Sequence, residues 1–258
     1  MIRTALLILY YAAAALAQPA LPAPLRNIGV DQKLNALLPL ELVLRDESGA
    51  QVKIGDYFGK RPVVLSLVYY RCPMLCDLVL NGMLRAFRTI SLDAGKDFEV
   101  VTISFDPRET PALASAKKAS YIEKYRRPSG ATGWHFLTAD QETIQRLAGA
   151  VGFRYTYDQK TDQFVHASAI MVLTPDGRLS RYFYGVEYPP RDLRLGLVEA
   201  SQHRIGNPVD QILLFCFHYD PSTGKYGLLI TRAVRIAGTL TVFAMIAGIF
   251  LLSRRKPC

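Results

Sequence analysis

The sequence has few of the residues that cross-link small proteins, since only four of its 258 residues are cysteines. This number is too low for a disulfide-rich scaffold, so a hydrophobic core must stabilise the fold. No internal repeat or low-complexity segment is visible, which excludes a repeat protein and a largely disordered chain. The composition, with 50% hydrophobic and 21% charged residues, fits one globular domain with appended segments.

Acidic residues are also scarce relative to basic ones, and the formal net charge is +9. Such an excess raises the question of nucleic-acid binding. The basic residues are scattered, however, and five of them lie at or near an apolar segment close to the C-terminus: Arg232, Arg235, Arg254, Arg255 and Lys256. We therefore expect no nucleic-acid partner.

Residues 1–17 have the layout of a secretory signal peptide. Arg3 precedes an apolar run over residues 5–16, and Ala15-Leu16-Ala17 matches a small-x-small cleavage site. The run is shorter than the roughly 20 residues that a membrane-spanning helix needs. We predict cleavage after Ala17, with an uncleaved anchor as the alternative, and a proline-containing linker over residues 18–36.

A second apolar segment, residues 233–252, is predicted to be a transmembrane helix. Its stretch from Ile236 to Leu252 carries no charge, and a basic cluster follows it. Basic flanks stay in the cytoplasm, so residues 253–258 should form a cytoplasmic tail of a single-pass inner-membrane protein. The main domain would then be periplasmic or otherwise extracytoplasmic, with residues 206–232 as a juxtamembrane segment. A buried core helix is the alternative.

Residues 37–205 are predicted to form an α/β domain with a mixed central sheet flanked by helices. Residues 62–70 and 98–104 are apolar runs typical of strands buried on both faces, and each precedes a helical pattern. This order favours parallel pairing of the two strands. Further elements are expected as a hairpin over residues 42–54, helices at 74–92, 110–126, 140–150 and from Pro190, and strands at 134–137, 165–173 and 179–184.

Cys72 and Cys76 lie where the first buried strand ends and a helix is predicted to begin, in the run YYRCPMLC. Residues four apart project from the same helical face, so both sulfurs can point to one object. The free amide groups of a helix start are expected to lower the thiol pKa. The pair can close into a disulfide or bind a soft metal such as Cu(I). Three residues separate the cysteines, one more than in thioredoxin-type reductases, and this wider spacing leaves room for a metal between the sulfurs; a structural disulfide is the alternative.

A third metal ligand would have to come from one of four histidines: His135, His166, His203 and His218. His166 lies early in the predicted strand 165–173, after a turn-like segment. Two thiolates and one imidazole would form a trigonal set suited to copper, whereas Zn(II) normally takes a fourth ligand. An ordinary surface or core histidine is the alternative for His166.

Three pieces of this sequence resemble the Sco/SenC family: the CPMLC run, the segment Ile103 to Pro111, and the strand that contains His166. The resemblance covers about residues 37–201. It implies a thioredoxin-like fold and copper bound as Cu(I) or Cu(II) by Cys72, Cys76 and His166. In that family an acidic residue of a DPxxxTP-like loop supports the site, and Asp106 matches it; a turn-forming aspartate is the alternative.

The resemblance implies a metallochaperone that delivers copper to a cytochrome c oxidase or matures its copper centre. The expected partner is the copper-bearing subunit of the oxidase, or another copper or thiol protein. The alternative is a membrane-anchored thiol-disulfide oxidoreductase in which Cys72 and Cys76 form the redox-active pair. A peroxidase-like enzyme is less favoured, because it would leave His166 without a role.

Two further sets of soft ligands remain open. Cys216 and His218 are two residues apart, so in an extended segment they would face the same way and form a second copper site. The apolar surroundings of Cys216 instead favour its burial. Met74, inside the cysteine motif, is either a weak thioether ligand or a packing residue of the first helical turn.

Overall fold

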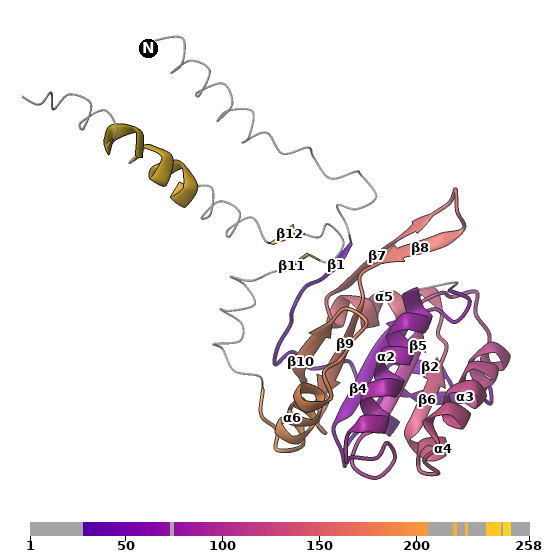
Figure 1. Cartoon of the computed structure of the whole chain (residues 1–258). Helices are drawn as coiled ribbons and strands as arrows, with labels where there is room; N and C mark the ends of the chain where they lie inside the picture. Colours follow the sequence, from indigo (N-terminus) through magenta and orange to yellow (C-terminus); the bar gives the residue numbers. More distant parts are fainter. Residues whose placement is uncertain are drawn as a thin grey trace, which may run out of the picture.

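The computed structural model describes residues 28–72, 75–205, 219–220, 225–226, 236–243 and 245–248 (Figure 1). The predicted signal peptide, residues 18–27 of the predicted linker, Met74 and the predicted tail 253–258 lie outside these residues. Cys216 and His218 lie outside them as well, so the structure does not test a second copper site.

The centre of the domain is a five-stranded mixed sheet with the strand order β10-β9-β4-β5-β6. β4 pairs in parallel with β5, β5 pairs in parallel with β6, and β9 runs antiparallel to both β4 and β10. Every residue of β4 is buried, as expected for a strand in which Ser66 is the single polar residue. The strands are β4 (Val63–Val68), β5 (Glu99–Ser104), β6 (Trp134–Leu137), β9 (Ala169–Leu173) and β10 (Leu179–Tyr184).

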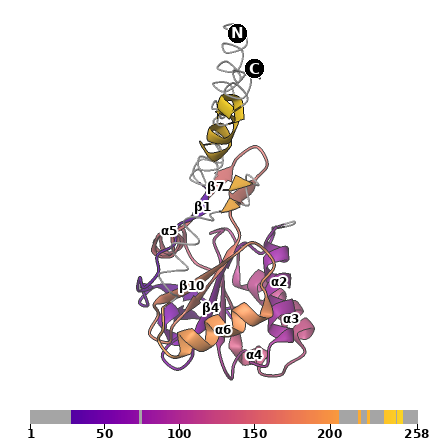
Figure 2. The ribbon, with the colours of Figure 1, turned by 60° about the vertical axis from the view of Figure 1, so that its left-hand side comes forward.

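Helices cover both faces of this sheet. α2 contacts both α3 and α6, α3 lies against β6, and α6 lies against β9 and β10. Figure 2 shows α5 on the opposite side of the sheet from α2 and α3. The helices are α2 (Leu75–Thr89), α3 (Pro111–Tyr125), α4 (Gly130–Gly133), α5 (Gln141–Ala150) and α6 (Pro190–Ser201). The predicted mixed α/β architecture is therefore confirmed.

The prediction of one strand over residues 165–173 is wrong. The segment divides into β8 (Gln163–His166), which pairs with β7 (Phe153–Asp158), and β9, which enters the central sheet. The β7–β8 hairpin extends past the end of the central sheet in Figure 1. Residues 167 and 168 separate the two strands, and a continuous apolar pattern does not reveal that its two halves have different partners.

The folded domain also begins earlier than the predicted boundary at residue 37. β1 (Gly29–Val30) pairs antiparallel with β7 and so belongs to the three-stranded sheet β1-β7-β8.

The predicted hairpin over residues 42–54 is present. The remaining short elements are β2 (Val43–Arg45), β3 (Gln51–Lys53), η2 (Ile54–Tyr57), β11 (Tyr219–Asp220) and β12 (Lys225–Tyr226).

The predicted transmembrane segment 233–252 is only partly inside the described residues, where 236–243 and 245–248 are helical. Within the part of the chain that the structure describes, no helix combines the length and the apolar character needed to cross a membrane.

Candidate metal centre

The two cysteines lie just after the end of β4. Cys72 precedes α2 and Cys76 is the second residue of that helix, in agreement with a helix predicted to begin at residue 74. The sequence places Pro73 after Cys72, and a residue before proline is disfavoured in the α conformation. The Cys76 amide donates to the Cys72 sulfur at 3.3 Å, and the Tyr69 amide donates to the Cys76 sulfur at 3.3 Å.

His166 is the last residue of β8, and its imidazole reaches the cysteines from the β7–β8 hairpin. Its Nε2 atom lies 3.5 Å from the Sγ atom of Cys76, although 90 residues separate the two along the chain. Its Nδ1 atom lies 2.9 Å from the Ala167 carbonyl oxygen, which can only accept a hydrogen bond. This contact assigns the proton of the neutral ring to Nδ1 and leaves the Nε2 lone pair directed toward the sulfur.

Cys72, Cys76 and His166 form a compact set of soft donors. Their ligand atoms all lie within 4.8 Å of one another, and all three residues are buried. Metal–ligand bonds to imidazole and thiolate are about 2.0–2.3 Å long, so donors at this spacing are within reach of one shared ion. Cys72 and Cys76 are not linked by a disulfide, and the hydrogen bond at Nδ1 resembles the contact that orients metal-binding histidines. The residues therefore fit a trigonal site for a soft cation.

Burial raises the pKa of the Cys76 thiol well above its usual range, and the neighbouring Cys72 adds to the effect. The expectation that the helix start lowers the thiol pKa is therefore wrong for Cys76. The side chain is almost fully removed from water, and desolvation disfavours the thiolate more than the helix amides favour it. A bound cation would supply the compensating positive charge.

Aromatic rings form the apolar surroundings of this site. The centroid of the His166 ring lies 5.0 Å from that of Phe105, 5.9 Å from that of Phe153 and 6.0 Å from that of Tyr69. Phe105 follows β5 directly, so the edge of the sheet that carries the cysteines also supplies this packing. The rings limit the freedom of the imidazole and exclude water from it.

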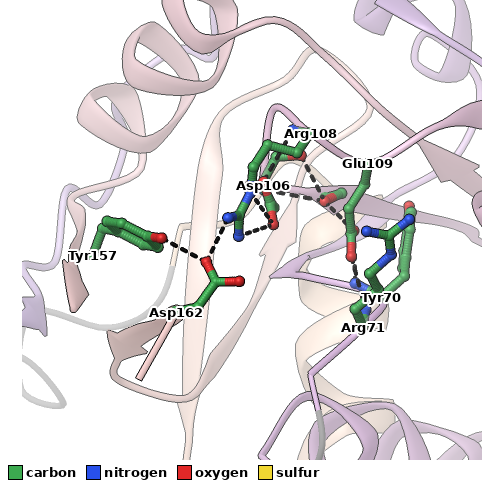
Figure 3. Close-up of polar contacts among 8 residues, drawn as sticks. Tyr70, Arg71, Asp106, Arg108, Glu109, Tyr157 and Asp162 are labelled. Atoms are coloured by element: carbon green, nitrogen blue, oxygen red, sulfur yellow. Dashed lines mark hydrogen bonds and ion pairs between the residues drawn. The ribbon is translucent and has the colours of Figure 1, made fainter. Parts of the chain in front are cut away.

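Glu109 is a site residue that the sequence analysis missed. Its buried carboxylate accepts hydrogen bonds from the amides of Tyr70 and Arg71, each at 2.7 Å, and from the Ser104 hydroxyl at 2.5 Å (Figure 3). It thereby holds the backbone just before Cys72. A signal was available, because an acidic side chain that follows β5 must lie near the end of its parallel neighbour β4.

Asp106, predicted to support the metal ligands, is buried and directed at Arg108. Its two carboxylate oxygens accept from the Nε and Nη2 atoms of Arg108 at 2.8 and 2.7 Å, and one also accepts from the Arg108 amide at 2.9 Å. This bidentate pair is a strong arrangement for an arginine and a carboxylate. Support of the metal ligands by Asp106 stays a prediction.

The other two described histidines lie elsewhere and have other partners. His135 is in β6, with Nε2 at 3.3 Å from a Glu99 carboxylate oxygen. His203 is exposed, with Nδ1 at 3.0 Å from Asp176. Of the three histidines that the structure describes, His166 is therefore the one that meets the cysteines.

A family model described as SCO1/SenC matches residues 32–197, well over half of the chain. Among solved structures, a protein from Aquifex aeolicus VF5 is 26% identical and aligns over 66% of this chain and 95% of its own, with a TM-score of 0.59. Arabidopsis thaliana ScoI with copper bound is 20% identical over 63% of this chain and 96% of its own, with a TM-score of 0.51.

BsSco, described as a member of the Sco family of cytochrome c oxidase assembly proteins with a disulfide switch, is 19% identical over 67% of this chain and 98% of its own. Its TM-score is 0.52. At these identities, the likeness to ScoI and BsSco shows a shared fold. No curated protein sequence matches this chain.

Proposed function

This chain belongs to the SCO1/SenC family, and from that premise we propose that it is a copper-binding metallochaperone. Its cargo would be copper, passed to a cytochrome c oxidase or used to mature the copper centre of that enzyme. The observation that carries the proposal is the meeting of Cys72, Cys76 and His166 at one end of the sheet. Two sulfurs and one imidazole are donors that suit Cu(I), and three donors leave a position open for a ligand of the acceptor protein.

The chemistry of the chain is consistent with binding and release. Burial raises the pKa of the Cys76 thiol and so favours its protonated form, and metal binding through the thiolate would displace that proton. The ring of His166 already has its Nε2 lone pair directed toward the sulfurs. The site is therefore preorganised for a cation, and protonation of the thiols would favour release.

The test is a copper titration of the reduced full-length chain without oxygen. Cys72→Ser, Cys76→Ser and His166→Ala should each lose tight copper binding. His203→Ala is the matched control, because His203 is an exposed histidine paired with Asp176, and it should bind copper like the wild type. Tight binding that survives in His166→Ala would contradict a three-ligand copper site.

The proposal includes a location on the outer face of the inner membrane. A cleaved signal peptide over residues 1–17, a transmembrane helix over 233–252 and a cytoplasmic tail 253–258 would anchor the domain beside a membrane-bound acceptor. A thiol reagent that cannot cross membranes tests this topology through Cys258, which should be labelled only after the cells are permeabilised. Labelling of Cys258 in intact cells would contradict it.

A thiol-disulfide oxidoreductase acting on oxidase or cytochrome cysteines is the second candidate function. It is favoured by two cysteines that are not disulfide-bonded and whose sulfurs lie within 4.8 Å of each other. Reduction of a substrate disulfide would form a Cys72–Cys76 disulfide and transfer two electrons and two protons to the substrate. This function predicts thiol exchange without copper that His166→Ala leaves unchanged.

A further inference from the structure

The guanidinium of Arg108 joins two parts of the chain that are far apart in sequence. One side of it forms the bidentate pair with Asp106, which follows β5. Its Nη1 atom donates to Asp162 at 2.6 Å, and Asp162 lies in the turn between β7 and β8 (Figure 3). Arg108 therefore connects the loop after β5 to the tip of the β7–β8 hairpin.

Further contacts strengthen this connection. The Tyr157 hydroxyl donates to the same Asp162 oxygen at 2.5 Å. The Arg108 guanidinium carbon lies 5.3 Å from the ring centroid of Tyr157 and 5.6 Å from that of Phe164, which are cation–π distances. Tyr157 and Phe164 are directly opposite each other in the β7–β8 ladder, so one arginine contacts both strands of the hairpin.

The same hairpin presents His166 to the cysteines. Phe164 and His166 are two residues apart in β8, so their side chains leave the same face of the strand. Arg108 packs on Phe164, and Phe105, three residues before Arg108, packs on both Phe164 and His166. Glu109, the residue that follows Arg108, accepts hydrogen bonds from the backbone just before Cys72.

We propose that Arg108 is a positioning residue that sets the distance between His166 and the cysteine pair by clamping the β7–β8 hairpin to the loop after β5. The loop after β5 then positions all three ligands. Arg108 positions the imidazole of His166, and Glu109 positions the backbone that carries the cysteines. The expected effect on copper affinity rests on the copper-binding function proposed above. The clamp itself rests on the contacts between Arg108 and the hairpin. A hairpin released from the clamp keeps its strand pairing but holds the imidazole less firmly.

Asp162→Asn tests the clamp with the least disturbance. Asp162 has a φ of 52°, a left-handed conformation that asparagine tolerates, so the turn should keep its shape. The substitution removes the charge that pairs with Arg108 and leaves the buried Asp106–Arg108 pair intact. We expect faster amide hydrogen exchange over residues 153–166 in the metal-free chain, and copper affinity lowered roughly twofold to fivefold, as for loss of an exposed ion pair.

Two further variants sharpen the result. Arg108→Lys keeps the positive charge but loses the planar guanidinium that contacts Asp106 and Asp162 together. We therefore expect the same increase in amide hydrogen exchange over residues 153–166. Glu41→Gln removes a comparably exposed ion pair, with side chains 63% and 52% exposed for Glu41 and Arg146 against 73% and 48% for Asp162 and Arg108. It should leave both the exchange of residues 153–166 and the copper affinity at the wild-type level.

A double-variant cycle identifies the route of the effect. Asp162→Asn should lower affinity in the wild-type background but have no further effect on the weaker copper binding of His166→Ala, because the clamp acts through His166. An equal loss in both backgrounds, or unchanged exchange over residues 153–166, would overturn the proposal. Failure of the wild type to bind copper would overturn the proposed function. Because hydrogen exchange is measured without copper, it would still show whether Arg108 clamps the hairpin.

Discussion

The carboxylate of Glu109 accepts a hydrogen bond of 2.7 Å from the backbone amide of Tyr70, 39 residues earlier in the chain. Its second oxygen accepts from the next amide along the chain. The backbone between β4 and Cys72 makes these bonds to a side chain of a neighbouring loop, which is how an irregular segment can stay buried. Glu109 thus orders the segment that delivers the cysteines.

Replacing Glu109 by Gln should destabilise the protein. A glutamine amide has one acceptor oxygen, so one of the two backbone amides loses its partner, at a cost of about 1–3 kcal/mol in the free energy of unfolding. Urea denaturation monitored by circular dichroism measures this loss. Glu123→Gln, on the exposed surface of α3, is the control and should change stability by less than about 0.5 kcal/mol. Equal stability of both variants would contradict the role of Glu109.

The metal-free reduced protein should lose stability in alkaline solution because of Cys76. Burial raises the pKa of this thiol above its value in the unfolded chain, which is about 8.5. The stabilisation is therefore fully present below pH about 8.5 and declines as the pH rises above it, since the unfolded chain releases its proton first. Unfolding free energies measured from pH 7 to 10 should fall more steeply for the wild type than for Cys76→Ala. Parallel curves would refute this expectation.

A methyl group at Gly82 should be poorly tolerated. Gly82 lies in α2, and a Cβ atom there would meet the carbonyl oxygen of Val186 at 1.9 Å, a clash with backbone that no side-chain rotation relieves. Gly82→Ala should thus lower the thermal midpoint by several degrees, as expected for a loss of more than about 1 kcal/mol.

Gly149 offers the matched control for that substitution. It lies in α5, where an added Cβ meets nothing within 4 Å. Gly149→Ala should stabilise the protein by about 0.5–1 kcal/mol, because alanine is the better helix former. Calorimetry that shows equal effects of the two substitutions would contradict the close approach at Gly82.

Asp140 should contribute a pH-dependent cap to α5. Its side chain accepts from the Thr143 amide at 2.8 Å, and this hydrogen bond lowers the pKa of the carboxyl group. The stabilisation is present above the unfolded-state pKa of about 3.9 and is lost as the pH falls through the lower folded value. Asp140→Ala should cost about 1 kcal/mol at pH 7 and less near pH 3. A cost independent of pH in denaturation curves would argue against this assignment.

Much of the domain follows from local sequence patterns. The apolar run before the cysteines predicts β4, the cap at Asp140 predicts the start of α5, and the alternation of strands and helices predicts the parallel pairing of β4 with β5. The cysteine pair was also recognisable from its spacing. His166 was one of four histidines until the resemblance to a family singled it out.

Properties that depend on distant neighbours were decided only by the tertiary structure. Local periodicity cannot assign β8 and β9 to different partner strands, and this division is what brings His166 to Cys76. Nor can it show that burial overrides the helix amides at the Cys76 thiol, or that Glu109 holds the cysteine segment. Sequence periodicity records which face of an element is buried, whereas a site depends on what that face meets, and that partner is set by the packing of the whole chain.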